Sequence, residues 1–381
     1  MPNWQTMTDK QSEKNSVFRI LDAAINRAGE GIRVVEDYVR MVLGDAYLAT
    51  QLKQLRHDLT AAVETIDPAE RIAARDSQGD VGRTIKTESE YQRGDLNETD
   101  SPSSGDEFNK MKLSGGMIQA NLARAQQAFR TIEEFSKTID PEISKSVEQL
   151  RYRTYTIEKA VLTTVVSLQN LAQANLYVLI DGCKIQSDQG KGLSELIKKL
   201  IQSNVSMIQL RDKTLTDREQ VVAGRLIAKL TRGTSTRFIM NDRSDLAIAC
   251  NADGVHLGQD DVDVADARRI LGAAKMIGVS THSIEQARAA VLAGANYLGV
   301  GPVFESETKQ FDAHVGLQLV SEVAKEIQLP AFAIGGITLG NLSDVIDAGL
   351  PRVAVSAAIA KSEDPSAAAI AFKSILDTAD Q

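Results

Sequence analysis

The second half of the chain alternates short apolar runs with amphipathic stretches. Apolar runs of this length are typical of buried strands, and helical patterns such as LSELIKKLIQS and EQVVAGRLIAKL separate them. Eight strand–helix units predict a parallel sheet closed as a (β/α)8 TIM barrel, with an open doubly wound sheet as the alternative. The eight runs are LYVLID (176–181), MIQLRDK (207–213), RFIMND (237–242), GVHLGQ (254–259), KMIGVST (275–281), YLGVGPVF (297–304), PAFAIGG (330–336) and RVAVSAAI (352–359).

The first half follows a helical pattern and shows no strand alternation. Between two pairs of helices lies a polar segment, about 67–113. Much of it is expected to be mobile, because TESEYQRGDLNETDSPSSGDEF cannot bury enough apolar surface to offset its ordering entropy. The pattern predicts an α/β protein with an all-helical domain over 1–170 and a barrel over 174–381. The expected helices run from about 16 to 43, 47 to 64, 116 to 138 and 141 to 173.

The helical half contains an internal repeat. NRAGEGIRVVEDY (26–38) aligns with ARAQQAFRTIEEF (123–135), and KQLRH (53–57) aligns with EQLRY (148–152). Chance similarity between amphipathic helices is the alternative, but matched charges in two successive helices favour a duplicated helical hairpin about a pseudo-twofold axis. The matched pairs are Arg27 with Arg124, Arg33 with Arg130, Glu36 with Glu133, and Asp37 with Glu134.

Composition limits the partners, the cellular location and the metals expected for this protein. The net charge of −8 argues against nucleic acid as a partner. No apolar run approaches the ~20 residues of a membrane span, and the polar N-terminus lacks the apolar region of a signal peptide. Cys183 and Cys250 alone form no disulfide framework, which fits a cytoplasmic protein. The four histidines lack metal-ligand spacing, so zinc is not expected.

Polar clusters follow three successive strands of the predicted barrel. They end the runs MIQLRDK, RFIMND and GVHLGQDD, at the barrel edge where such enzymes keep their chemistry. Asp242 and Asp261 follow adjacent strands, and two nearby carboxylates repel each other unless a cation lies between them. Mg²⁺ favours a few carboxylates completed by water and phosphate oxygens. Helix capping is the alternative, and it weighs more for Asp260 and Asp263.

Cations and glycines at the same edge predict two phosphate sites. Arg211, Lys213 and Lys309 are suited to a diphosphate leaving group, with surface solvation as the alternative. The glycine pair at 335–336 and Ser356 follow strands seven and eight, where barrels often bind phosphate. Tight helix–strand packing is the alternative at the first of these glycines. No cysteine, histidine pair or serine triad offers a strong nucleophile, so electrostatic chemistry is expected.

These motifs together resemble the thiamine-phosphate synthase family. QLRDK, IMND, HLGQDD, GVST, GPVFESETK, AIGGI and VSAAI occur in the family's order and cover the whole barrel. The resemblance implies that 4-amino-5-hydroxymethyl-2-methylpyrimidine diphosphate is joined to 4-methyl-5-(2-phosphooxyethyl)thiazole, giving thiamine monophosphate and diphosphate. In this family, diphosphate loss leaves a pyrimidinylmethyl cation that the thiazole nitrogen captures.

The resemblance also implies roles for individual residues. Arg211, Lys213 and Lys309 would act on the diphosphate, and Asp242 and Asp261 would bind Mg²⁺. A departure from the family occurs at 310–312, where many relatives carry a second Lys or another polar residue before Asp, and this chain reads Gln310, Phe311, Asp312. The remaining substrate-binding residues would be Gln209, Asn241 and Ser280 with the pyrimidine diphosphate, and Ser306, Thr308, Gly336, Val355 and Ser356 with the thiazole phosphate. Leu210, Asp212 and Glu307 would also bind substrate.

The helical half resembles a noncanonical hydroxymethylpyrimidine phosphate kinase family often fused to this synthase. LDAAINRAGEGIRVVEDYVR, LKQLRHDL, ARDSQGDVG and LRYRTYTIEKA carry the resemblance. A kinase using ATP would make the barrel's diphosphate substrate, although the chain has no Walker-type glycine loop. Two groups could serve it: Asn26, Glu30, Arg33 and Asp37 on one helix face, and Arg75, Asp76, Asp80 and Gly82 in a polar loop.

Several alternatives remain open from the sequence. The helix face could be a buried salt-bridge network between repeats, and the loop a flexible linker. The helical half could accordingly be a non-catalytic dimerisation or regulatory module, and the oligomeric state is open, a homo-oligomer included. The barrel could be a phosphate-binding regulator that has lost catalysis, but its intact acids, Asn241 and Lys309 argue against that. The expected ligands are small phosphorylated molecules.

Overall fold

The computed structural model describes residues 4–76, 107–182, 190–305 and 316–379. By its internal contacts the chain divides into two compact units, one of Met1–Leu43 with Leu48–Glu158 and one of Gly44–Tyr47 with Lys159–Gln381. No helix in the described ranges has both the length and the hydropathy needed to cross a bilayer.

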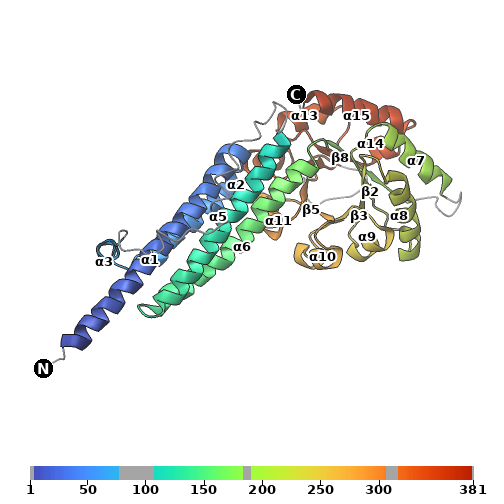
Figure 1. Ribbon diagram of the computed structural model, residues 1–381. Coiled ribbons are helices and arrows are strands. Elements are labelled where there is room, and N and C mark those ends of the chain that lie inside the picture. Colours follow the sequence, from blue (N-terminus) through green and yellow to red (C-terminus); the bar gives the residue numbers. More distant parts are fainter. Residues whose placement is uncertain (1–3, 77–106, 183–189, 306–315, 380–381) are drawn as a thin grey trace, which may run out of the picture. The chain divides into compact units, whose positions relative to one another are not determined.

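Helices build the N-terminal unit (Figure 1). The predicted helices are present, but two begin earlier than their apolar patterns suggest, and α6 ends three residues sooner. The short helix α3 was missed, although Asp67 caps it by accepting from the Ala69 N–H at 2.8 Å, with Pro68 at its first position. The elements are α1 Trp4–Tyr38, the π-helical turn η1 Val39–Leu43, α2 Ala46–Ala62, α3 Pro68–Ala73, α5 Glu107–Ser136 and α6 Pro141–Asn170.

The sequence repeat is matched by a repeat of ion pairs. Glu36 on α1 is 3.1 Å from the Nε of Arg56 on α2, and Glu133 on α5 is 3.0 Å from the Nε of Arg151 on α6. Both carboxylates are buried, so each needs its guanidinium partner. Gly31 lets the two hairpins approach, because an added Cβ would lie 2.7 Å from the Asn121 carbonyl oxygen.

The second unit is a closed parallel barrel in which strands β1 to β8 pair in chain order (Figure 1). The predicted (β/α)8 fold is therefore confirmed. Most strands stop before the polar end of the corresponding apolar run, so those polar residues lie in the loops beyond the strands. The strands are β1 Leu176–Ile180, β2 Met207–Leu210, β3 Arg237–Asn241, β4 Gly254–Leu257, β5 Met276–Thr281, β6 Tyr297–Val300, β7 Ala331–Ile334 and β8 Val353–Val355.

Helices follow the strands, and buried rings fill the barrel. Tyr177 on β1, Tyr297 on β6 and Phe332 on β7 meet edge to face, with ring centroids 5.5–5.9 Å apart. Two of these three rings carry hydroxyls that need hydrogen-bond partners inside the core. The helices are α7 Lys191–Gln202, α8 Asp217–Thr231, α9 Ser244–Cys250, α10 Val264–Leu271, α11 Ile284–Ala293, α12 Gly316–Glu326, α13 Leu342–Asp347, α14 Ala357–Ala360 and α15 Pro365–Ala379.

Candidate active site

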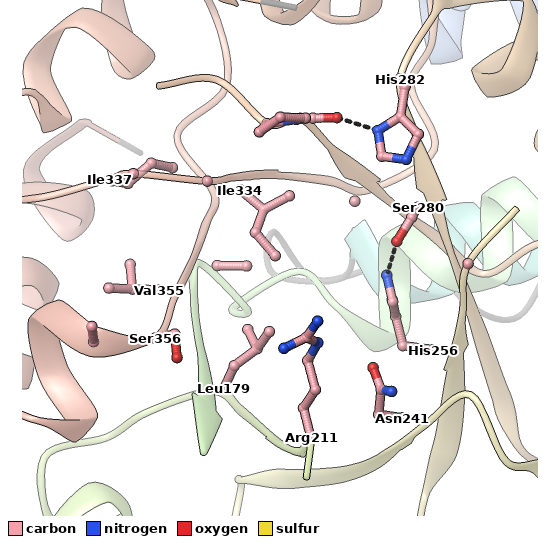
Figure 2. A pocket seen from close by; sticks show the side chains of 18 of the residues that line it. Leu179, Arg211, Asn241, His256, Ser280, His282, Ile334, Ile337, Val355 and Ser356 are labelled. Carbon is pink, nitrogen blue, oxygen red and sulfur yellow. Dashed lines mark hydrogen bonds between the residues drawn. The ribbon is translucent and has the colours of Figure 1, made fainter. Parts of the chain in front are cut away.

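A cavity of about 870 Å³ opens at the carboxyl ends of the barrel strands. Figure 2 shows Arg211 and Asn241 reaching into it from one part of the rim, with Val355 and Ser356 at another. The rim therefore brings together two groups of residues that the sequence separates by more than a hundred positions. Of the predicted site residues, the lining includes Arg211, Lys213, Asn241, Asp242, Asp261, Ser280, Gly336, Val355 and Ser356.

The β2 loop carries the cationic part of the cavity. Arg211 and Lys213 line the space, whereas Asp212 between them does not. The Asp212 carboxylate accepts from the N–H groups of Gly182, Thr214 and Leu215 at 2.7–3.0 Å. Burial opposes its ionisation, but these hydrogen bonds outweigh burial and lower the pKa of Asp212. Asp212 thus shapes the loop that presents the two cations.

Two other predicted substrate-binding residues of β2 lie below the cavity. Leu210 is buried in the barrel wall. Gln209 is also buried, and its side-chain Nε2 donates to the Tyr177 hydroxyl. Neither residue belongs to the lining of the cavity. The family motif therefore marks Gln209 and Leu210, but the side chains of both point into the core.

Asp242 and Asp261 form the acidic part of the cavity. Burial, followed by the charge and hydrogen bond of Asp261, raises the pKa of Asp242 to about 6, and the charge of Arg211 opposes the rise. The backbone orients both acids: Asp242 has a left-handed φ of 58° and donates its N–H to the His256 carbonyl at 2.8 Å, while Asp261 accepts the Gly258 N–H at 2.6 Å. A carboxylate whose pKa is raised by a neighbouring carboxylate suits a divalent cation.

The two acids suit Mg²⁺ better than a metal ion that needs all of its ligands from the protein. Within the described ranges, no group of three or more His, Cys, Asp or Glu side chains could hold a metal. Mg²⁺ takes few protein carboxylates and fills its remaining positions with water and phosphate oxygens. An open site with two acids beside Arg211 and Lys213 has that character.

The acids of the β4 loop differ in whether they cap the following helix. Asp263 caps α10 by accepting the Asp266 N–H at 2.7 Å, so the capping alternative is confirmed there. Asp260 lines the cavity and is exposed. Neither Asp242 nor Asp261 is the N-cap of the following helix, since Arg243 and Asp263 hold those positions.

A glycine-rich wall forms at the ends of β7 and β8. Gly335 and Gly336 have positive φ of 102° and 64°, and an added Cβ at Gly336 would lie 2.3 Å from the Glu305 carbonyl oxygen. At Gly335 the close neighbour is Pro302 in the β6 loop, at 2.7 Å, so the packing is loop to loop and not helix to strand. Ser356 precedes α14 with no side-chain capping bond. Backbone and hydroxyl donors can therefore approach a ligand closely here.

Two histidines line the site although the sequence did not predict them as site residues. Their spacing served only as an argument against zinc. His256 lines the cavity floor, and burial lowers its pKa to about 4, so the ring is neutral near pH 7. Its Nε2 lies 2.9 Å from the Ser280 Oγ (Figure 2). His282 also lines the cavity and contacts the Gly301 carbonyl oxygen through Nδ1. The signal for His256 was its place inside a strand of a recognised motif.

Several sequence predictions fall outside the described residues. The described β6 loop ends with Glu305, which lines the cavity. Beyond the described ranges lie Ser306, Glu307, Thr308, Lys309, Gln310, Phe311 and Asp312 of that loop, Asp80 and Gly82 of the polar loop, Cys183, and residues 87–106 of the segment expected to be mobile.

The N-terminal unit has a groove of about 580 Å³ between α1 and α5. Arg27 forms no ion pair within the described part of the chain, and Arg124 has only a 3.4 Å contact to Asn121. All ten lining residues fall into repeat-related pairs, so the groove lies where the two repeats face each other. The pairs are Ala24 with Asn121, Arg27 with Arg124, Glu30 with Gln127, Gly31 with Ala128, and Val34 with Thr131.

The other residues considered for the helical half lie apart from this groove. Arg33 pairs with Asp37 at 3.2 Å on the exposed surface. Asn26 lies 3.4 Å from Asp22, which also holds Arg75 at 2.6 Å. The described residues show no buried salt-bridge network between repeats on this helix face, and the buried acids Glu36 and Glu133 are each paired within their own hairpin. The final described loop residue, Asp76, pairs with Arg19 at 3.6 Å.

A (β/α)8 barrel with a cationic and acidic cavity at its strand ends defines an enzyme of the TIM-barrel class. Residues 176–359 match the family described as thiamine monophosphate synthase, and residues 19–103 and 99–160 match the ThiD2 family. The thiamine-phosphate synthase of Rhodopirellula baltica is 38% identical over 375 residues, which are 96% of this chain and 94% of that protein. The chain belongs to the thiamine-phosphate synthase family, transferases of thiamine biosynthesis.

Two further proteins are similar to this chain. The thiamine-phosphate synthase of Nostoc punctiforme is 37% identical over 358 residues, covering 94% of this chain and 93% of its own. Among solved structures, the thiamine phosphate pyrophosphorylase from Pyrococcus furiosus is 30% identical and covers 54% of this chain and 97% of its own, with a TM-score of 0.48. The curated relatives thus span both the helical half and the barrel.

Proposed function

We propose that the barrel joins 4-amino-5-hydroxymethyl-2-methylpyrimidine diphosphate to 4-methyl-5-(2-phosphooxyethyl)thiazole, releasing diphosphate and thiamine monophosphate. One observation supports this most: two cations, two acids and a glycine-rich wall line the same cavity of about 870 Å³. A single cavity of this size accommodates two small phosphorylated substrates side by side. The cationic part takes the diphosphate, and the wall of Gly336, Val355 and Ser356 takes the thiazole phosphate.

The reaction needs its leaving group stabilised more than it needs a nucleophile. Arg211 and Lys213 hold the diphosphate and neutralise the negative charge that grows as its bond to carbon breaks. Asn241 and Ser280 supply further hydrogen bonds to the same substrate. Lys309, Ser306, Glu307 and Thr308 keep the roles that the family resemblance gives them. The departing pair of electrons leaves with the diphosphate, and the thiazole nitrogen supplies the new bond.

Asp242 and Asp261 are the residues proposed to hold Mg²⁺. When bound, the ion would offset charge on the diphosphate and relieve the repulsion between the two carboxylates. The raised pKa of Asp242 is the observation behind this assignment. The neighbouring Asp260 has no such role in the proposal.

The test compares Asp242→Ala with Asp260→Ala in the full-length protein. Thiamine monophosphate formation is measured from both substrates over a range of Mg²⁺ concentrations. The Asp242 variant should lose at least about 100-fold in turnover, as expected when one preorganised electrostatic group is removed. The Asp260 variant should stay within about threefold of the unmodified protein. Near-normal turnover by the Asp242 variant would overturn the metal assignment.

We further propose that the N-terminal unit phosphorylates the pyrimidine monophosphate with ATP. The match to the ThiD2 family supports this proposal, as does the groove that Arg27 and Arg124 both line. Two guanidinium groups are suited to a phosphate of either substrate. The product would be the diphosphate that the barrel consumes.

This proposal can be tested in the full-length Asp242→Ala background, where the diphosphate should accumulate. The protein is given ATP, Mg²⁺ and the pyrimidine monophosphate, and the diphosphate is quantified. Replacing both Arg27 and Arg124 with Gln should abolish its formation, whereas Arg40→Gln, which removes an exposed arginine outside the groove, should not. If the unmodified groove yields no diphosphate, the helical half is instead the non-catalytic dimerisation or regulatory module.

A further inference from the structure

A chain of buried hydrogen bonds crosses the barrel core and ends at Ser280 in the cavity. Gln209 on β2 donates from Nε2 to the Tyr177 hydroxyl, which lies 3.2 Å from the Tyr297 hydroxyl. The Tyr297 hydroxyl lies 3.2 Å from His256 Nδ1, and His256 Nε2 lies 2.9 Å from Ser280 Oγ. Four of the five side chains are buried, and only Ser280 is partly exposed. The proposed reaction gives a role to Ser280 but none to the four buried side chains behind it.

The chain has a direction because each member has few hydrogens to give. A tyrosine hydroxyl has one hydrogen, and a neutral histidine has one N–H. Tyr177 accepts from Gln209, so its own hydrogen goes to Tyr297, and the hydrogen of Tyr297 then goes to His256 Nδ1. His256 is left with its hydrogen on Nε2, pointing at the Ser280 oxygen.

This direction leaves the hydroxyl hydrogen of Ser280 free to point into the cavity. Ser280 Oγ accepts from the histidine and has one hydrogen left to donate. The opposite direction would start with Ser280 donating to the histidine, and a serine lone pair would then face the cavity. A lone pair repels the oxygens of an anionic substrate, whereas an O–H stabilises them.

We propose that His256 is a positioning residue, held by Tyr297 as the Nε2–H tautomer so that Ser280 presents its hydrogen to an anionic oxygen of the diphosphate substrate. The inference rests on the proposed function, because it needs an anion beside Ser280. His256 does not exchange protons with the substrate in this arrangement. Tyr297 and Tyr177 act one and two steps further away, through the same chain.

The first test reads the tautomer without any assay of activity. The full-length protein is labelled with ¹⁵N-histidine, and its four histidines are distinguished by the loss of one signal set in His256→Gln. The ¹⁵N shifts of His256 should identify Nδ1 as unprotonated and Nε2 as protonated. A protonated Nδ1 would reverse the chain and overturn the proposal, whatever the enzyme's turnover.

The second test asks whether the tyrosine acts through the serine. In Tyr297→Phe, kcat/KM for the diphosphate substrate should fall about tenfold, the effect of misdirecting one hydrogen bond to a charged group. In a Ser280→Ala background, the same change should cost less than about twofold, since no hydroxyl is left to orient. An equal cost in both backgrounds would overturn the proposal and assign Tyr297 to packing.

Phe332→Leu is the matched control for that cycle. Phe332 packs against both tyrosine rings, at centroid distances of 5.5 and 5.7 Å, but it makes no hydrogen bond in the chain. Its replacement should cost the same factor with and without the Ser280 hydroxyl. If the unmodified protein makes no thiamine phosphate at all, the proposed function fails, and the tautomer measurement still decides the direction of the chain.

Discussion

Charges in the two units are arranged in opposite ways. In the helical unit, the buried acids Glu36 and Glu133 each meet an arginine from the neighbouring helix. At the barrel rim, Asp242 and Asp261 face each other, and within the described residues neither Arg211 nor Lys213 forms a salt bridge. Paired charges hold a fold together, whereas charges left unneutralised are available to a ligand. Substitutions in the first group should therefore change stability, and those in the second should change activity.

The largest effect is expected from Arg211→Gln. Arg211 presents a fixed positive group to the cavity, and losing such a group at a developing charge costs about 10²–10³ in rate. Steady-state kcat/KM for the pyrimidine diphosphate should fall by that factor, with the unfolding midpoint in urea unchanged. Arg218→Gln, at an exposed position on α8, serves as the control and should keep full activity. If the Arg211 variant unfolded at a lower urea concentration but kept its kcat/KM, Arg211 would contribute to stability and not to activity.

Arg151→Met should have the opposite profile. Arg151 is 12% exposed and Glu133 is 6% exposed, so the substitution removes the less exposed of the two arginines that pair with this buried carboxylate and leaves only Arg130, at 2.5 Å. The free energy of unfolding, measured by urea titration, should drop by about 2 kcal/mol, the usual loss for a hydrogen bond to a charged group. The repeat supplies an internal control: Arg56 is 31% exposed and Glu36 keeps Arg33 at 3.8 Å, so Arg56→Met should cost less, about 1 kcal/mol.

Both variants should retain the synthase rate of the barrel under conditions in which they are folded. A loss of turnover out of proportion to the folded fraction would mean that the helical unit contributes to the barrel reaction. Equal losses of stability in the two variants would show that solvent exposure does not control the strength of these pairs.

The stability of the metal-free protein should depend on pH because the pKa of Asp242 differs from that of an ordinary carboxylate. The pKa of Asp242 is about 6 when folded and lies above its unfolded value. The folded state thus binds an extra proton in the window between the two values, and this contribution to stability is lost as the pH rises through about 6. Urea titrations in a metal chelator should therefore show the metal-free protein losing stability across this window.

Two comparisons check that assignment. Asp261→Asn removes the neighbouring charge, so the pKa of Asp242 should fall and the pH dependence should flatten. Saturating Mg²⁺ should stabilise the protein more at pH 7 than at pH 5, because the ion binds the deprotonated carboxylates. Identical pH profiles for the Asp261 variant and the unmodified protein would show that Asp261 does not raise the pKa of Asp242.

Sequence patterns predicted the barrel and the repeat because each rests on local periodicity. The strand starts were predicted to within one residue, since buried parallel strands are continuous apolar runs, whereas several runs extend beyond the strand ends. The helices α1 and α5 begin earlier than predicted; in α1, residues 12–16 are exposed, so they contribute no amphipathic pattern. Motifs also located Arg211, Asp242 and Asp261 in one cavity, since parallel strands end at one rim.

Side-chain direction was harder to predict than position in the chain. Gln209 and Asp212 belong to the same motif as Arg211, yet one lies in the core and the other braces a loop. Within a strand and its loop, neighbouring residues face different ways, so a motif alone does not show which of them reach a ligand. His256 was missed for the complementary reason: its role depends on Tyr297 and Ser280, which come from other strands.

The smallest effect is expected from an acid at the barrel rim that stabilises the fold and does not bind a ligand. Asp263 is two residues from Asp261, and its carboxylate caps α10 at 2.7 Å from the Asp266 N–H. Asp263→Ala should lower the free energy of unfolding by about 1 kcal/mol, the usual cost of a lost N-cap, and leave the Mg²⁺ dependence of turnover intact. Asp263→Asn should recover most of that stability, because an asparagine side chain caps equally well. Asp261→Ala, by contrast, should change the Mg²⁺ dependence. If Asp263→Ala shifted the Mg²⁺ requirement as strongly, neighbouring acids on this loop would share one role, and pairing would no longer distinguish structural from functional charge.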